Sequence, residues 1–167
     1  MRRLLGCMVL SLSLLVGIAH ADASKLYFGV GISDGRVDIA NDSDESIGAV
    51  NASFGLQLRD FVSIELAVGS ASDQSNSILR DPQVTYQAAM LRLGYRWKRG
   101  GAYIIGGQAL LDIDEQFITS DGGMVYGFGI NLFGNETTAL NFHVLDFDDG
   151  AFRTATIGFQ HYFGELR

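Results

Sequence analysis

Apolar residues alternate with small or polar residues through most of residues 25–163. In the stretch YGFGINLF, every even-numbered residue is aromatic or aliphatic, and the residues between them include Gly127, Gly129 and Asn131. Successive side chains of a β-strand point to opposite faces of the sheet. The alternation therefore predicts strands that have one apolar face and one face of small and polar residues.

Eight segments show this alternation, and they are separated in turn by short turns and long polar loops. The expected strands are residues 25–33, 49–58, 61–70, 86–97, 102–111, 126–133, 139–147 and 152–163. One long loop holds Pro82, the only proline, a residue that the interior of a strand would exclude. An even number of such strands with alternating short and long connections is typical of an up-and-down membrane barrel.

The segment at 102–111 alternates least clearly. We expect Gly106 and Gln108 on its polar face, which also places Ile104 and Leu110 on that face. Tyr103 is then expected on the apolar face.

The content of the two faces distinguishes a membrane barrel from a soluble one. In a lipocalin-like barrel or a sandwich, the apolar face points inward and the polar face meets water. The expected polar face carries many glycines: Gly29, Gly31, Gly55, Gly69, Gly94, Gly106, Gly127, Gly129 and Gly158. Such glycines would weaken a water-exposed sheet, but inside a narrow barrel they make room for larger polar neighbours.

Aromatic residues on the apolar face gather near the short turns. They are Tyr95, Trp97, Tyr103 and Phe163, and an aromatic belt would lie at this level of a membrane barrel. The sequence therefore favours an all-β fold, an eight-stranded antiparallel up-and-down transmembrane β-barrel. A soluble lipocalin-like binder is the alternative.

The amino terminus has the pattern of an export signal. Two arginines precede an apolar stretch at 4–18, and the sequence AHA that follows fits a cleavage site. The stretch is shorter than the roughly 20 residues that span a bilayer, which argues against a membrane anchor. We expect residues 1–21 to be a cleaved secretory signal peptide and residues 22–167 to form one barrel domain. Cleavage would remove Cys7, the only cysteine, so disulfides are not expected.

The charge balance excludes one class of partner. The chain has 12 basic and 19 acidic residues, a net charge of −7, and loss of the signal peptide would remove two of the arginines. A basic surface for nucleic acid is therefore not expected.

The run YGFGINLFGNETTALNFHVLDF, followed by TATIGFQHYF, resembles the last three strands of small bacterial outer-membrane barrels of the OmpX, Ail and OmpA transmembrane-domain kind. The resemblance in pattern extends over residues 25–163. It implies short periplasmic turns, outward-facing long loops and a place in the bacterial outer membrane. It also implies that Phe163 is the terminal aromatic residue read by the barrel assembly machinery, although the chain continues to Arg167.

Charged and polar residues on the expected lumen face are the candidate site. Counted from the short turns, Glu65 lies between the levels of Arg92 and Arg96. A buried charge must be paired, and arginine offers fork-shaped donors that suit a carboxylate. We expect these three residues to form a polar network that fills the lumen. The network would also include Gln57, Gln108, Asn131 and His143. The alternative is a gated path for small ions through the same network.

Neither a catalytic site nor a metal site is expected. His161 faces outward, as does the histidine of lipid-modifying outer-membrane hydrolases, but no serine lies beside it at strand spacing. The loops are acidic, with Asp38, Asp42, Asp44, Glu45, Asp112, Asp114, Glu115, Asp146, Asp148 and Asp149. They lack the regular ligand spacing of an EF-hand, so solvated charge is the simpler interpretation, and we expect no cofactor.

These features lead to a functional hypothesis. We expect an integral outer-membrane barrel without enzymatic activity, whose role is structural or is recognition and adhesion through its extracellular loops. A narrow pore is the second hypothesis, and a lipid A-modifying enzyme is the third. The expected partners are membrane lipids and lipopolysaccharide, the barrel assembly machinery and an extracellular partner of the loops.

Overall fold

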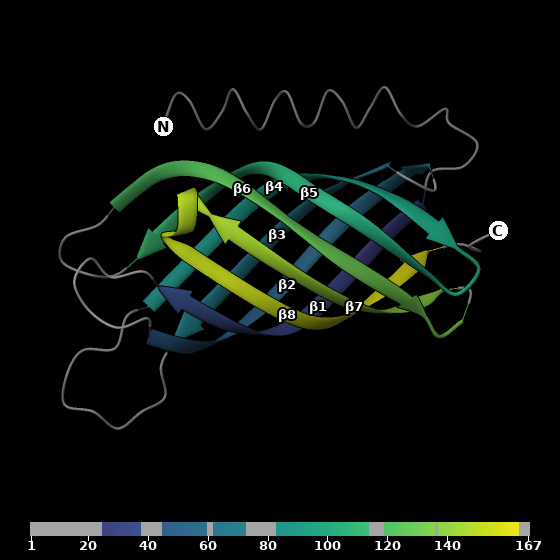
Figure 1. Cartoon of the computed structure of the whole chain (residues 1–167), viewed down its shortest axis with the longest axis horizontal. Helices are drawn as coiled ribbons and strands as arrows, with labels where there is room; N and C mark the ends of the chain where they lie inside the picture. Colours follow the sequence, from purple (N-terminus) through teal and green to yellow (C-terminus); the bar gives the residue numbers. More distant parts are fainter. Residues whose placement is uncertain are drawn as a thin grey trace.

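The computed structural model describes residues 25–37, 45–59, 62–72, 83–113, 119–135 and 137–163. These residues form one closed β-barrel (Figure 1). The expected signal peptide lies outside them, and its cleavage stays a prediction. In the described part of the chain, no helix is both long and apolar enough to cross a membrane.

Eight strands make the barrel. They are β1 (Lys25–Val37), β2 (Glu45–Arg59), β3 (Val62–Ser72), β4 (Gln83–Trp97), β5 (Gly100–Ile113), β6 (Thr119–Phe133), β7 (Thr138–Phe147) and β8 (Phe152–Phe163). Each strand pairs antiparallel with the next, and β8 pairs with β1 to close the sheet. A single 3₁₀ turn, η1 (Asp148–Gly150), joins β7 to β8. The predicted fold class is confirmed.

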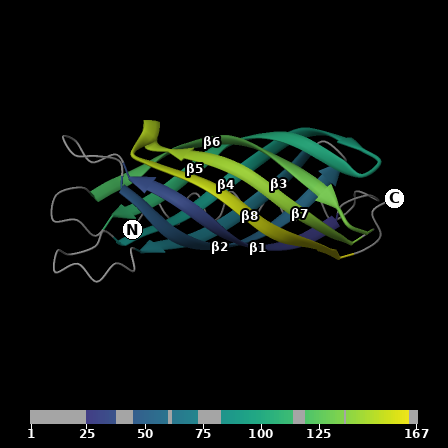
Figure 2. The same ribbon diagram turned by 60° about the horizontal axis from the view of Figure 1, so that its bottom comes forward.

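The two ends of the barrel carry different connections. The end that we call the turn side carries the β2–β3, β4–β5 and β6–β7 connections, the first residue of β1 and the last residue of β8. The opposite end, the loop side, carries the other four connections. The turn side lies to the right in Figure 1. Figure 2 shows that the strands are strongly tilted against the long axis of the barrel, as closure of a sheet requires.

An apolar belt covers the outer face. Every strand contributes at least one large apolar side chain that remains exposed, for example Phe28, Phe54, Leu66, Leu91, Ile104, Phe128, Val144 and Phe159. A belt of this extent is far larger than the apolar patches of soluble monomers, and it is the surface that lipid requires of a membrane barrel. The expected apolar-out orientation is confirmed for every strand except β5.

The orientation expected for β5 is wrong. Ile104, Gly106, Gln108 and Leu110 are exposed on the outer face, and Tyr103 points into the lumen. The cause is the two-residue turn between β4 and β5, because it sets Trp97 opposite Gly100. Directly paired residues share a face.

The pairing continues in this register along both strands. The outward Ala89 lies opposite Gln108, and the inward Arg92 lies opposite Ile105. The aromatic residues of the turn-side belt are therefore Tyr95, Trp97 and Phe163, which are all exposed, without Tyr103.

Two glycines on the inner face make room for tyrosine rings. A Cβ atom at Gly55 would lie 2.1 Å from the ring of Tyr27, and one at Gly69 would lie 2.3 Å from the ring of Tyr86. Both rings are almost fully buried in the lumen. The lumen is thus a packed interior, and its glycines determine where large side chains fit.

Candidate functional site

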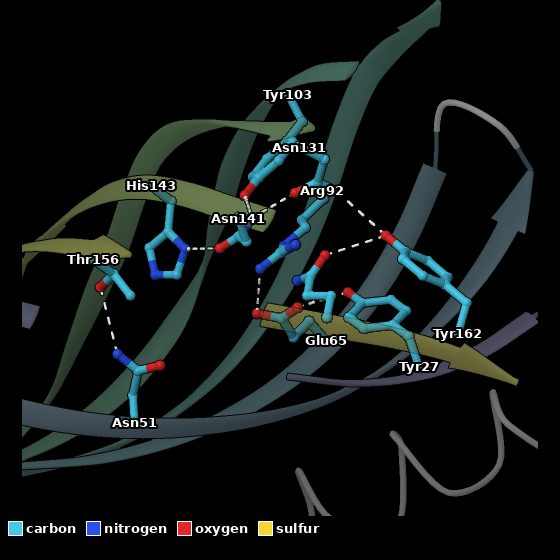
Figure 3. Close-up of polar contacts among 11 residues, drawn as sticks. Tyr27, Asn51, Glu65, Arg92, Tyr103, Asn131, Asn141, His143, Thr156 and Tyr162 are labelled. Carbon is cyan, nitrogen blue, oxygen red and sulfur yellow. Dashed lines mark hydrogen bonds and ion pairs between the residues drawn. The ribbon is translucent and has the colours of Figure 1, made fainter. Parts of the chain in front are cut away.

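A buried ion pair lies in the lumen, on the inner faces of β3 and β4. Arg92 Nη2 donates to Glu65 Oε1 over 2.6 Å, and the two side chains are only 5% and 1% exposed. Tyr27 Oη, from β1, donates to the other carboxylate oxygen over 2.6 Å. Figure 3 shows the carboxylate between the guanidinium and the phenol. Both oxygens of the buried carboxylate therefore have a donor, as burial of a charge demands.

Aromatic rings surround the guanidinium of Arg92. Its central carbon lies 4.6 Å from the centroid of the Tyr103 ring and 5.8 Å from that of Tyr27. The face of an aromatic ring attracts a cation. The charge of Arg92 is therefore held by one carboxylate and two rings, which come from three other strands.

Amide and hydroxyl groups extend this network across the lumen. Asn141 donates to Tyr103 Oη and, over 2.5 Å, to Asn131 Oδ1. Asn131 in turn donates to Tyr162 Oη over 3.3 Å, and Tyr162 donates to Gln160 over 3.1 Å. The chain of bonds connects β5, β6, β7 and β8, so it links the strands on the side opposite the ion pair.

A second branch of polar contacts lies nearer the loop side. His143 Nδ1 lies 2.6 Å from Asn141 Oδ1. Asn51 donates to Ser33 Oγ over 2.7 Å, and Ser33 and Thr156 share a further hydroxyl bond of 2.7 Å. Asn51, Ser33 and Thr156 come from β2, β1 and β8, so these contacts cross the seam between the first and last strands.

The remaining expected members of the network lie elsewhere. Arg96 is half-buried, and its guanidinium lies 4.5 Å from the centroid of the Phe133 ring. Gln57 lies near the end of β2, where it lines an opening on the turn side. Gln108 is outside the lumen altogether, because of the orientation of β5.

Several residues of the network were not among the predicted site residues. Tyr27, Asn141 and Tyr162 were on the expected lumen face, and their size and polarity could have identified them. Tyr103 was missed because the opposite face of β5 was expected to point into the lumen.

The loop-side half of the lumen is filled with apolar side chains. The buried cluster there includes Ile47, Val84, Tyr86, Leu111, Val125, Leu145, Phe147 and Phe152. Three of its rings are in contact, since the ring centroids of Tyr86 and Phe147 are 4.8 Å apart and those of Phe147 and Phe152 are 5.6 Å apart. We call this cluster the apolar plug. It lies between the polar network and the loop side.

The described residues offer no constellation for metal or nucleophilic chemistry. Among them, no group of three or more His, Cys, Asp or Glu side chains could hold a metal ion. His161 is exposed on the outer face, where its Nδ1 lies 3.5 Å from Thr138 Oγ1 and its ring meets the edge of Phe163. This distance is longer than the roughly 2.6–3.2 Å between a hydroxyl nucleophile and its activating base.

The acidic loop residues lie only partly within the described chain. Asp38, Asp42, Asp44, Asp114 and Glu115 lie outside it. Asp146 forms an ion pair with Arg153, whose side chain is 63% exposed, through Arg153 Nε over 2.7 Å. Asp148 and Asp149 are the first two residues of η1, and each has a positive φ.

Comparison with known proteins identifies the fold. No protein-family model and no curated protein sequence matches this chain. Solved structures do match: Ail, the attachment invasion locus protein of Yersinia pestis, has a TM-score of 0.60 at 12% identity, over 84% of this chain and 99% of that chain. Neisserial surface protein A has a TM-score of 0.64 at 10% identity, over 85% and 100% of the two chains.

A designed transmembrane β-barrel is also similar, with a TM-score of 0.58 at 11% identity, over 83% of this chain and 95% of the designed one. At such identities, similarity shows the fold and not the activity. The fold and the apolar belt together define the class of the protein as a small eight-stranded transmembrane β-barrel. Two of its structural neighbours, Ail of Yersinia pestis and OprG of Pseudomonas aeruginosa, are described as outer membrane proteins.

Proposed function

We propose that this chain is an integral protein of the bacterial outer membrane whose role is structural or is contact with partners through its loops, and that it is neither a pore nor an enzyme. The observation that carries the proposal is the filled lumen. A polar network crosses its turn-side half, and the apolar plug fills its loop-side half. The loops are then the part of the barrel that is available for recognition.

The apolar plug argues against the pore hypothesis. An ion that passed the Glu65–Arg92 pair would next meet Phe147, Phe152 and Tyr86, which are at most 3% exposed. Transfer of a bare charge into such surroundings is prohibitively costly. We expect the purified protein to show no steady conductance in planar bilayers, and steady single-channel steps would contradict the proposal.

The surroundings of His161 argue against a lipid-modifying enzyme. Its described partners are Phe163 and Thr138, whose hydroxyl lies 3.5 Å from the imidazole, farther than the roughly 2.6–3.2 Å between a nucleophile and its activating base. Neither of these two side chains is a carboxylate that could orient the imidazole. We expect overexpression to leave the mass spectrum of lipid A unchanged. New deacylated species that vanish with His161→Ala would establish the enzyme instead.

The acidic loops limit the kind of partner. One crystal structure of Ail contains the heparin analogue sucrose octasulfate, a polyanion. The loop sequences of this chain are rich in Asp and Glu, and like charges oppose association. We therefore propose a partner other than a polyanionic glycan, together with membrane lipids and, through divalent cations, the phosphates of lipopolysaccharide. Stronger binding of whole cells to heparin-coated than to uncoated surfaces would contradict this.

We also propose that Phe163 is part of the signal that the barrel assembly machinery reads. It ends β8, and the residue is 57% exposed. Heat-modifiable gel mobility of fractionated outer membranes tests both location and assembly. Wild-type protein should migrate faster unboiled than boiled, and Phe163→Ala should reduce the folded fraction. Recovery of wild-type protein in the soluble periplasm would overturn the proposed location.

A further inference from the structure

The turn between β4 and β5 carries two exposed cations, Lys98 and Arg99. We call this pair the cationic turn. The other two short connections each contain an acidic residue, Asp60 in one and Glu136 in the other, but this turn contains none. Neither Lys98 nor Arg99 forms an ion pair with its side chain in the described chain. Both charges are therefore available to a ligand from outside the barrel.

The backbone of the cationic turn is held against the barrel. Phe133 N, at the end of β6, donates to Arg99 O over 3.1 Å, and Trp97 pairs directly with Gly100. The indole of Trp97 lies close to Gly100, because a Cβ atom there would be 2.7 Å from the ring. The two cations therefore project from a hydrogen-bonded turn beside the only tryptophan of the chain.

The cationic turn lies where lipid headgroups are expected. Tyr95 and Trp97 directly precede it and are exposed on the outer face, and such residues gather where hydrocarbon meets headgroups. Farther along β4, the exposed Leu93 and Leu91 continue the outer face as a surface for acyl chains. A lipid that lies along β4 would therefore have its phosphate beside the two cations.

The acidic residues are concentrated at the opposite end of the barrel. Apart from Glu65, those of the described chain lie in its loop-side half: Asp34, Glu45, Asp112, Asp121, Asp146, Asp148 and Asp149. No aspartate or glutamate lies at the turn-side end of the strands that the structure describes. An anionic headgroup is therefore favoured on the turn side and opposed on the loop side.

We propose that the cationic turn binds the headgroups of anionic phospholipids in the leaflet that surrounds the turn side. The proposal rests on the outer-membrane location proposed above, in which this leaflet faces the periplasm. Arg99 can donate two parallel hydrogen bonds to a phosphate, and Lys98 adds a point charge. Each such cation near an anionic membrane surface strengthens binding by about fivefold.

Trp97 is the reporter for the test, because bromine atoms on neighbouring acyl chains quench its fluorescence. The full-length mature protein is folded into two sets of vesicles with the same proportions of phosphatidylglycerol and phosphatidylcholine. In one set the phosphatidylglycerol is brominated in the upper part of its acyl chains, and in the other an equal amount of phosphatidylcholine is brominated. The surface charge of the two sets is therefore the same.

We expect brominated phosphatidylglycerol to quench Trp97 more strongly, with an apparent preference of about fivefold or more at low salt. The preference should fall as salt is added, because ions screen exposed charges. Equal quenching in the two sets of vesicles at low salt would overturn the proposal.

Two variants that each remove one exposed arginine separate the cationic turn from the general charge of the protein. Arg99→Gln should lower the preference by about fivefold, and addition of Lys98→Gln should abolish it. Arg36→Gln removes an exposed arginine near the loop-side end of β1 and should leave the preference within about twofold. Equal losses in Arg99→Gln and Arg36→Gln would overturn the site. Lys98→Gln replaces Arg99→Gln if the latter lacks the folded gel band.

The gel band also separates this proposal from the proposed function. A wild-type barrel that shows the folded band but no lipid preference would overturn the lipid site alone. Wild-type protein that shows no folded band in either set of vesicles would contradict both the membrane barrel and the lipid site.

Discussion

Arg92 and Glu65 meet across the β3–β4 ladder without being directly opposite each other. Glu65 pairs with Met90, and Arg92 pairs with Ser63, so the ion pair is diagonal and spans two rungs of the sheet. The carboxylate can then also accept a hydrogen bond from Tyr27 of β1, two strands away from the β3 strand that carries Glu65. One acidic side chain thereby connects β1, β3 and β4, and the guanidinium that it binds also lies over the ring of Tyr103 from β5.

Breaking this pair should be costly. We expect Glu65→Gln to lower the free energy of unfolding by about 3–5 kcal/mol, because it leaves the buried Arg92 without its counter-charge. Unfolding by urea in lipid vesicles, followed by gel mobility, measures the change. Asp146→Asn is the control, since it breaks the more exposed pair with Arg153 and should cost only about 0.2–1 kcal/mol. Similar losses in both variants would show that the lumen pair is hydrated.

A pair of glycine substitutions tests the packing of the lumen. Gly55→Ala places a methyl group against the ring of Tyr27, whereas Gly106→Ala places it on the outer face, where nothing lies within 4 Å. We expect the first to lower the free energy of unfolding by about 1–3 kcal/mol through overpacking and the second to be neutral or slightly stabilising. The same urea titration measures both. A neutral Gly55→Ala would show that Tyr27 can move aside.

The orientation of β5 can be read with spin labels. Labels introduced one at a time at positions 104, 106 and 108 should have high accessibility to oxygen, which partitions into lipid, and labels at 105 and 107 should have low accessibility. The reason is the register set by the two-residue turn. The opposite alternation would mean that Gln108 belongs to the lumen network after all.

Removal of the ion pair should not open a pore. We expect Glu65→Gln combined with Arg92→Gln to conduct no better than wild type in planar bilayers, because the apolar plug remains. Substitution of both Phe147 and Phe152 by alanine should increase conductance, since it removes two of the three contacting rings. Steady current through the first double variant alone would place the barrier at the ion pair and favour a gated path.

The sequence was sufficient for the barrel and for the central contact of its lumen. Alternation with a period of two identified every strand, because lipid outside and a narrow lumen inside impose opposite compositions on the two faces. The level of Glu65 relative to the short turns was enough to bring it near Arg92, since paired strands rise together. The same comparison of levels did not predict the surroundings of Arg96, whose guanidinium lies over the ring of Phe133.

Two features could not be predicted from the alternation of residue types. In β5, glycine and alanine occupy both faces, so composition did not distinguish lipid from lumen, and only the pairing of Trp97 with Gly100 decided the orientation. The length of the short turn, two residues, could have predicted this orientation, because it determines which residues of β4 and β5 pair. The apolar plug was hidden because its residues lie at the loop-side ends of the strands, where the alternation fades and both faces carry apolar residues. At these strand ends, the residues that fill the lumen are of the same types as those that face lipid. Only the geometry of the barrel shows which of them point inward.

The position of Phe152 has a consequence for how the barrel is made. This ring comes from the last strand, yet it lies against Gly35 of the first strand, where a Cβ atom would be 2.9 Å from it, and it belongs to the same buried cluster as Ile47. Dehydration of the interior therefore cannot be completed until β8 has met β1. Closure of the sheet and burial of Phe152 therefore go together, so the hydrophobic effect stabilises the pairing of the first and last strands.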